Sequence, residues 1–332
     1  MMEPVTIGLD IAKHVFHVHA VDAQGRVTSR QRLRRGEIAA PPGWDRGLRH
    51  RPYWAREIQR FGHDVRLIPP AYVKPYVRRG AKNDAADAAA ICEAVSRPNM
   101  RFVPIKSVEN QGFLMVHRAR GLLVGQRTMT ACAIRAHFAE FGIIVGQGRQ
   151  RVDGLVDLLD DEELALPATA RMSLAVLVNQ LKELDRQVDV IERELAQIQR
   201  VNPMARLPSS IPGVGPITAT AVAATVPDPT MFRSGRGFAA WLGLTPKQNS
   251  TVGKDRLGRI AGRSYLRHLL VIGARNVVRY PKARSRVGGG WIEDLLERRR
   301  PMVVAIAVAN KLARIIWAMM TTGEFYRAKA AG

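Results

Sequence analysis

A heptad repeat in the middle of the chain constrains the fold most strongly. Apolar residues recur there at alternating spacings of three and four for more than three heptads, with Lys, Arg, Glu and Asp between them. The apolar members are Leu174, Leu177, Leu181, Leu184, Val188, Ile191, Leu195 and Ile198. The repeat predicts one long helix with an apolar stripe that must be covered. A coiled coil, a helical hairpin arm, or packing of the helix on its own domain would each cover it.

The chain before this repeat has the pattern of an α/β domain. Short apolar runs separated by turn residues predict three strands within residues 5–34, and Val65–Ile68 predicts a further strand. Helices are expected near Trp54–Phe61, over Ala85–Val95 and over residues 107–140. Alternating strands and helices favour a sheet covered by helices, and we assign this domain to residues 1–145.

A linker and the helical arm occupy residues 146–203, and a mostly helical domain is expected over residues 204–332. Ile211–Ala219, with Gly213 and Gly215, joins two helical patterns in the manner of a helix-hairpin-helix turn. The backbone N–H groups of such a turn can bind a DNA phosphate, although a purely structural turn has the same pattern. Helices are expected over Phe238–Leu244, Tyr265–Arg279 and Pro301–Met320, and a mobile, polar loop over Thr245–Ser264.

The charge balance identifies the class of partner. The 332 residues include 51 Lys and Arg against 29 Asp and Glu, a net charge of +22. This excess predicts binding to nucleic acid. Arginines at alternating positions of one strand and just beyond it predict a strip that follows phosphates, with a solvated face as the alternative: Arg30, Arg32, Arg34 and Arg35.

The remaining bulk features indicate a protein of a reducing cytoplasm. No signal peptide is expected, because the N-terminal residues run directly into the first predicted strand. The apolar run Val303–Met320 is interrupted by Asn310, Lys311 and Arg314, so a helix is expected there and no membrane span. Cys92 and Cys132 are expected to be buried thiols, without metal-binding spacing.

Three acids are the candidate metal ligands. Asp10 ends the first strand, and Asp84 and Asp87 lie three residues apart at the start of a helix, so the two helical carboxylates share a face. Together the three could bind Mg²⁺, or Mn²⁺ in its place. A turn-forming role is the alternative for Asp10. The nearby His14, His17 and His19 are interpreted as partly exposed strand residues rather than metal ligands.

The loop 245–264 contains a candidate nucleophile. Ser250 and Thr251 lie there among cations, namely Lys247, Lys254 and Arg256. Cations beside a hydroxyl group can hold a phosphate for attack. Hydroxyl groups that are merely solvated are the alternative.

Five stretches, in order and spread over nearly the whole chain, carry a resemblance to a known family. They are Ile7-Gly8-Leu9-Asp10-Ile11-Ala12-Lys13, Gly62–Asp87, Ile211–Ala219, Phe238–Pro246 and Asn310-Lys311-Leu312-Ala313-Arg314. The chain resembles transposases of the insertion-sequence-110 family, in the branch named insertion sequence 1111. Pilin-gene inverting recombinases are related to this family.

The resemblance implies a RuvC-like N-terminal domain of the RNase H type, a coiled-coil arm and a C-terminal transposase domain. It implies an Asp-Glu-Asp-Asp metal site, of which Asp10, Asp84 and Asp87 would be three members. A serine would attack DNA covalently; the alignment places Thr251 there with Ser250 adjacent, and we favour Ser250 slightly. It also implies a bacterial cytoplasmic protein associated with the nucleoid, double-stranded DNA as substrate, dimers or tetramers with composite sites, and in some members a structured guide RNA.

The glutamate of that site is missing from the expected strand. The segment Trp44–Pro52 stands in its place, and a shift of one nucleotide, with permitted codons, converts it into the family's Gly-Ile-Glu-Ala-Cys-Gly-Thr-Ala-His. We hypothesise a local frameshift with a short deletion that disrupts residues 38–53 and impairs this copy. Asp45 as a substitute acid is the less favoured outcome.

Two other functions are consistent with the same residues. One is a catalytically inactive protein that binds nucleic acid and oligomerises through the heptad helix. The other is a RuvC-type junction resolvase, which would need the acids but neither hydroxyl group.

Overall fold

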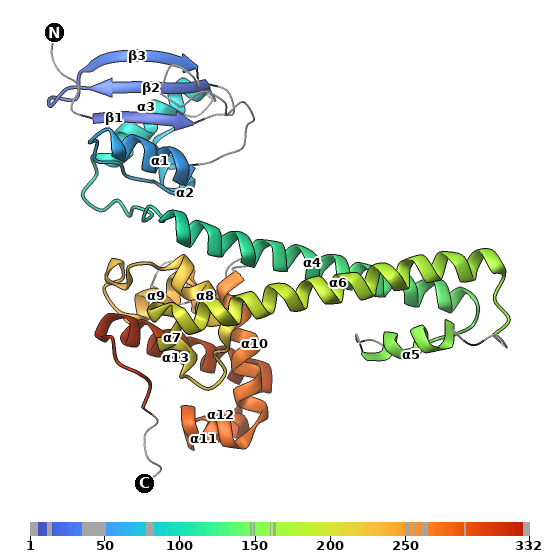
Figure 1. Ribbon diagram of the computed structural model, residues 1–332. Coiled ribbons are helices and arrows are strands. Elements are labelled where there is room, and N and C mark those ends of the chain that lie inside the picture. The colour runs from blue at the N-terminus through green and yellow to red at the C-terminus, as the bar shows by residue number, and fades with distance from the viewer. Residues whose placement is uncertain are drawn as a thin grey trace. The chain divides into compact units, whose positions relative to one another are not determined.

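The computed structural model describes most of the chain, which divides into two compact units, residues 1–107 and 108–332 (Figure 1). The described residues are 6–11, 15–34, 51–77, 83–146, 148, 150–159, 161, 164–249, 253–254, 256–260, 265–288 and 290–327. The first unit ends before the long helix that begins at Val108, because that helix packs on elements of the second unit. Its boundary therefore lies earlier than residue 145.

A three-stranded antiparallel sheet forms the centre of the first unit. The strands are β1 (Thr6–Ile11), β2 (Val15–Val21) and β3 (Val27–Arg34), in the order β1-β2-β3. Asp22 shapes the turn between β2 and β3, since its Oδ1 accepts hydrogen bonds from the backbone N–H groups of Gln24 and Arg26, both at 2.9 Å. The three strands predicted within residues 5–34 are confirmed.

Helices cover the two faces of this sheet. Helix α3 (Asp84–Val95) packs on β1 and β2, while Phe16 on the opposite face of β2 contacts Trp54 of α1 (Arg51–Arg60), with ring centroids 5.0 Å apart. The approach of α3 is close: a Cβ added at Gly8 would lie 2.2 Å from the carbonyl oxygen of Ala88. Glycine in β1 therefore determines how near α3 lies to the sheet.

The prediction of a strand over Val65–Ile68 is wrong. Of these residues, only Leu67 forms a β-bridge, antiparallel to Val103. Two short helices, α2 (Pro70–Val73) and η1 (Lys74–Tyr76), follow directly. Each has a proline in its first turn, where the fixed φ of proline suits the start of a helix. The expected disruption near residues 38–53, with Asp45, lies almost wholly outside the described residues.

Two long helices form an antiparallel hairpin in the second unit: α4 (Val108–Glu140) and α6 (Ala168–Val201), connected through α5 (Gln150–Leu159). Arg120 pairs with Glu192, and Arg127 with Asp185, across the hairpin. Heptad residues of α6 are buried between the helices and the adjoining bundle: Leu174, Leu181, Leu184, Val188, Leu195 and Ile198. The stripe is thus covered within the chain, as the hairpin-arm alternative requires.

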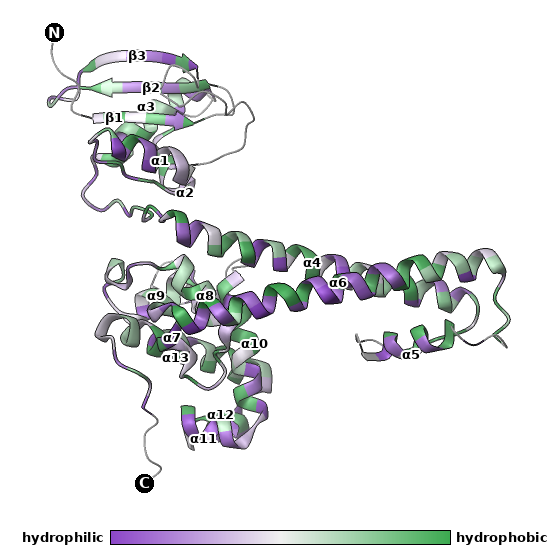
Figure 2. Cartoon of the chain, in the orientation of Figure 1, coloured by the Kyte–Doolittle hydropathy of each residue, from purple (hydrophilic) through white to green (hydrophobic). Residues whose placement is uncertain are grey.

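The rest of the second unit is a helical bundle. Its elements are α7 (Pro203–Ser209), α8 (Pro216–Thr225), η2 (Pro229–Met231), α9 (Gly235–Trp241), α10 (Tyr265–Arg279), α11 (Pro281–Val287), α12 (Gly290–Arg298) and α13 (Pro301–Thr322). Figure 2 shows the apolar character of α13, which is long and apolar enough to cross a membrane. Its residues Val304, Val308, Leu312 and Ile316 lie in the core that also includes α10, and this accounts for its composition.

The segment Thr245–Ser264, expected to be a mobile loop, contains two short strands. These are β4 (Pro246–Gln248) and β5 (Leu257–Ile260), which pair antiparallel. Gly253 lies between them with φ of 71°, a conformation that favours glycine. The expectation of two buried thiols is also corrected, since Cys92 is buried and Cys132 is exposed.

Candidate functional site

The three candidate metal ligands lie together in the first unit. One carboxylate oxygen each from Asp10, Asp84 and Asp87 lies within 4.8 Å of the others. Ligands on opposite sides of Mg²⁺, each about 2.1 Å from the ion, would stand about 4 Å apart, so small side-chain movements suffice for one cation. Asp84 is exposed and the other two are partly buried. The donor set, made of carboxylate oxygens alone, suits Mg²⁺ or Mn²⁺.

Local structure explains why these acids meet. Close packing at Gly8 brings α3 against β1, two residues before Asp10. Helix α3 starts at Asp84 because Asn83 caps it, with the Ala86 N–H donating to Asn83 Oδ1 at 2.7 Å. Acidic side chains in the first turn of a helix complement the positive end of its dipole. Strand β1 therefore supplies one acid, and the first turn of α3 supplies two.

His17 lies next to this cluster and is partly exposed, as predicted, whereas His19 is buried, which corrects its interpretation as partly exposed, and His14 lies outside the described residues. His17 lies opposite Asp10 in the β1–β2 register, and its Nε2 lies 3.5 Å from Asp84 Oδ2. The side chain of His17 is only 20% exposed. The alternation of β2 indicates that His17 and His19 share a face, but only the pairing with β1 places His17 beside Asp10.

The predicted arginine strip lies on the same face of the sheet. Arg30, Arg32 and Arg34 are exposed on β3 and stand opposite His19, His17 and Val15 of β2. A row Asp10–His17–Arg32 thus crosses the three strands, and with strands about 4.8 Å apart its ends are separated by about 10 Å. Arg35 lies outside the described residues. Burial, and secondarily the charge of Arg30, lowers the pKa of His19.

The candidate nucleophiles belong to the other compact unit. Ser250 and Thr251 lie outside the described residues, in the connection from β4 to β5. Lys254 and Arg256 are exposed near the end of this connection, and the Asn249 N–H donates to the Arg256 carbonyl oxygen at 2.7 Å. Lys247 belongs to β4. The hairpin therefore brings the two ends of the connection together, with cations on the β5 side.

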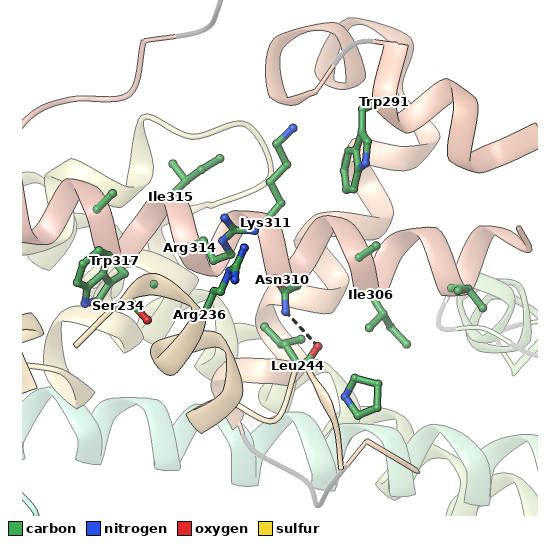
Figure 3. A pocket seen from close by; sticks show the side chains of 15 residues that line it. Ser234, Arg236, Leu244, Trp291, Ile306, Asn310, Lys311, Arg314, Ile315 and Trp317 are labelled. Carbon is green, nitrogen blue, oxygen red and sulfur yellow. Dashed lines mark hydrogen bonds between the residues drawn. The ribbon is translucent and has the colours of Figure 1, made fainter. Parts of the chain in front are cut away.

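A groove of about 1160 Å³ lies beside this hairpin, and the sequence pattern did not predict it. Figure 3 shows Arg236, Lys311 and Arg314 along an otherwise mostly apolar wall. Pro246 of β4 also lines it. The Lys311 ammonium lies 4.6 Å from the ring centroid of Trp291, and the Asn310 side-chain amide donates to the Leu244 carbonyl oxygen at 3.3 Å.

The two turn glycines have different surroundings. Gly213 has φ of 87°, and a Cβ there would lie 2.6 Å from Val277 Cγ2 on α10. Gly215 is exposed at the N-terminus of α8, with nothing near an added Cβ. Helices α7 and α8 therefore flank a tight turn, as predicted. Packing against α10 explains the glycine at 213.

Comparisons with known proteins identify relatives of this chain. Residues 205–287 match the family model described as "Transposase IS116/IS110/IS902 family". A "Probable family 20 transposase" of Pseudomonas aeruginosa is 44% identical over 97% of this chain and 98% of its own length. The "Transposase for insertion sequence element IS1328" of Yersinia enterocolitica is 36% identical over 96% of this chain and 98% of its own length.

The "Transposase for insertion sequence element IS1111A" of Coxiella burnetii is 35% identical over 98% of this chain and 92% of its own length. The similarity thus extends over nearly the whole chain. This chain belongs to the IS116/IS110/IS902 family of transposases.

Proposed function

We propose that this transposase cleaves and rejoins DNA at element ends and target with a divalent metal ion and a hydroxyl nucleophile. The observation that carries the proposal is the convergence of Asp10, Asp84 and Asp87 beside an exposed row of arginines. A RuvC-like domain would have such a cluster at the end of its first strand. Bound Mg²⁺ would neutralise charge on the attacked phosphate and orient it.

The protein residues have separate roles in this scheme. Arg30 and Arg32 bind flanking phosphates, and His17 positions Asp84 through its Nε2 contact. The hydroxyl group of Ser250 or Thr251 forms an oxygen–phosphorus bond while the bond from phosphorus to the deoxyribose oxygen breaks. The released DNA oxygen takes up a proton, and the hydroxyl group of a second strand later displaces the protein oxygen.

Basic residues of the second unit supply further DNA contacts in this proposal. Arg236, Lys311 and Arg314 along the groove, with Lys254 and Arg256 near the hairpin, form a basic surface next to the connection that contains the hydroxyl groups. Lys247 and the backbone of the turn at Gly213 and Gly215 are further DNA contacts predicted from the sequence. A structured guide RNA and association with the nucleoid remain predictions from the resemblance.

Replacement of Asp10 tests the metal site. In wild-type protein we expect Mg²⁺ to raise the melting temperature and to support strand transfer. Asp10→Asn should lose both effects and keep DNA binding, because one of three carboxylate ligands is removed. Asp64→Asn is the control, since Asp64 is an exposed acid of the same unit that pairs with Arg66 on the surface. Mg²⁺-dependent stabilisation of Asp10→Asn equal to that of wild type would refute the site.

The sequence of Trp44–Pro52 favours a second candidate, a protein that binds DNA but has lost cleavage. This segment stands where the family has a strand that ends in glutamate, and it contains no glutamate. We expect steeply salt-dependent DNA binding without cleavage in this case. Replacing residues 44–52 with Gly-Ile-Glu-Ala-Cys-Gly-Thr-Ala-His should then restore Mg²⁺-dependent cleavage. Mg²⁺-dependent cleavage by the unaltered protein, equal in rate to that of the protein with the replaced segment, would exclude the second candidate.

A further inference from the structure

The first unit contains a small pocket beyond the C-terminal end of α3, away from the acid cluster. Its volume is about 280 Å³, and residues of α2, of η1 and of the turn that follows α3 line it. The lining residues are Ala71, Tyr72, Pro75, Tyr76, Arg97, Asn99, Met100 and Arg101. All of them belong to residues 1–107, so the pocket is formed within one compact unit.

Two tyrosines give this pocket aromatic walls. Tyr72 is 43% exposed, and Tyr76 is partly buried. The Arg97 guanidinium lies 5.8 Å from the ring centroid of Tyr76 and also pairs with Glu93 at 2.6 Å. The charge of Arg97 is therefore already paired, and its guanidinium supports the ring of Tyr76. An exposed tyrosine beside a supported one suits the stacking of an unpaired base.

The turn after α3 adds polar groups that suit a nucleotide. The exposed side-chain amide of Asn99 can donate and accept hydrogen bonds, as the edge of a base requires. Arg101 is exposed, and among the described residues no carboxylate pairs with it, so its charge is available for a phosphate. Aromatic faces, an amide and a cation around one small pocket match the three parts of a nucleotide that a protein contacts.

We propose that this pocket binds one unstacked base of a single-stranded nucleic acid. The base stacks on Tyr72, Asn99 hydrogen-bonds its edge, and Arg101 binds an adjoining phosphate. The volume is just below the range of about 300–1,000 Å³ for pockets that hold drug-sized ligands, so it suits a single planar base. A duplex is excluded, because its bases are paired and stacked inside the helix.

The inference rests on the proposed function for its class of partner, which is nucleic acid, and it adds a binding site for an unpaired base. Asp84 and Asp87 lie in the first turn of α3, and Arg97 follows its last turn, so the helix separates pocket and acids by about 18 Å. A strand bound at the acids would reach the pocket within a few nucleotides. Exchange of strands between duplexes unpairs bases, and the pocket holds one of them outside the stack.

Binding of short DNA strands to the full-length protein without Mg²⁺ tests the proposal. One strand is abasic except for a single central thymine, and the other is fully abasic, so both carry the same phosphates. We expect wild type to prefer the thymine-containing strand by about fivefold or more in fluorescence anisotropy. Tyr72→Ala should remove this preference, and Tyr72→Phe should keep it. Phe61→Ala is the control, since Phe61 is 55% exposed in the same unit but does not line the pocket.

Arg101→Gln separates the phosphate contact from stacking. We expect weaker binding of both strands by the same factor, with the preference for thymine unchanged, because the two strands carry the same phosphates. Arg60→Gln is the control, since it removes the same charge from an arginine of α1 that pairs with Glu57. Equal weakening by Arg101→Gln and Arg60→Gln would contradict the phosphate contact.

Photo-cross-linking locates the base and distinguishes the two sources of a single strand. A DNA strand with 4-thiothymidine or an RNA strand with 4-thiouridine should cross-link to Tyr72 or Tyr76, as peptide mass spectrometry detects. The strand that cross-links more strongly identifies DNA or RNA as the partner.

Three outcomes would overturn the proposal: equal binding of wild type to the thymine-containing and abasic strands, equal preference in Tyr72→Ala and Phe61→Ala, or cross-links confined to residues outside the pocket. Because these assays involve neither Mg²⁺ nor cleavage, such a failure leaves the test of the metal site by Asp10→Asn unaffected.

Discussion

His117 is a buried titratable residue that connects three helices of the second unit. It is 3% exposed, with Nδ1 3.1 Å from the Tyr265 hydroxyl oxygen and Nε2 3.1 Å from Thr220 Oγ1. Thr220 donates its hydroxyl hydrogen to the Pro216 carbonyl oxygen at 2.7 Å, so Thr220 Oγ1 accepts from His117 Nε2–H. Nδ1 then accepts from the Tyr265 hydroxyl group. This network requires the neutral imidazole, and burial, with a smaller effect of Arg120, lowers the pKa of His117 to about 4.

Stability should therefore depend on pH through this residue. The unfolded chain, with a His pKa of 6.5, binds the proton more readily than the folded one. The contribution is complete above pH 6.5 and is lost as the pH falls toward 4, a difference of about 3 kcal/mol. Chemical unfolding of wild type and His117→Gln at pH 7 and pH 4 measures it.

The expected signature is a smaller loss of unfolding free energy on acidification in His117→Gln than in wild type. His268→Gln is the control, since His268 is exposed on α10. Identical acid-dependent losses in wild type and His117→Gln would contradict a neutral, buried His117.

The tight turn between α7 and α8 depends on close packing of Gly213, in the turn, against Gly273 of α10. A Cβ at Gly273 of α10 would lie 2.0 Å from the Gly213 carbonyl oxygen, and a Cβ at Gly213 would meet both Val277 and Gly273. Gly213→Ala adds this overlap to the strain of φ at 87°. We expect a loss of unfolding free energy of about 2–4 kcal/mol.

Gly215→Ala provides the matched comparison two residues away. Gly215 has φ of −82°, and an added Cβ meets nothing within 4 Å. We expect a change of less than about 1 kcal/mol, measured by the same urea unfolding. Similar losses for Gly213→Ala and Gly215→Ala would show that close packing does not explain the first glycine.

Helices in which apolar residues repeat at helical spacing could be predicted from the sequence. The pairing of strands and the packing of helices against one another could not. The helix expected over Tyr265–Arg279 has these bounds in the structure, because its apolar residues repeat at helical spacing. The β4–β5 pair lies in a polar segment without alternation, so no local signal distinguished it from a loop. Asp10, Asp84 and Asp87 could be predicted as a group. The place of His17 depends on strand register, and the groove depends on how α9, α12 and α13 pack.

The excess of positive charge in the whole molecule predicts strong, salt-dependent binding to DNA. At a net charge of +22, much of the affinity should come from release of counterions by cations such as Arg30 and Arg32. Both are exposed on the sheet face of the acid cluster, so DNA bound there would approach the proposed metal site. The long-range field attracts DNA, and the local row of arginines fixes where the backbone lies.

The salt dependence separates those two contributions. For Arg30→Gln combined with Arg32→Gln, the slope of log K against log salt should become shallower by about 2, because each lost phosphate contact contributes about 0.9. The control is Arg97→Gln combined with Arg186→Gln, which removes the same charge from residues that pair with Glu93 and Glu183. If both double variants change the slope equally, net charge alone governs binding. A larger change in the first variant places the DNA backbone along β3, beside Asp10 and His17.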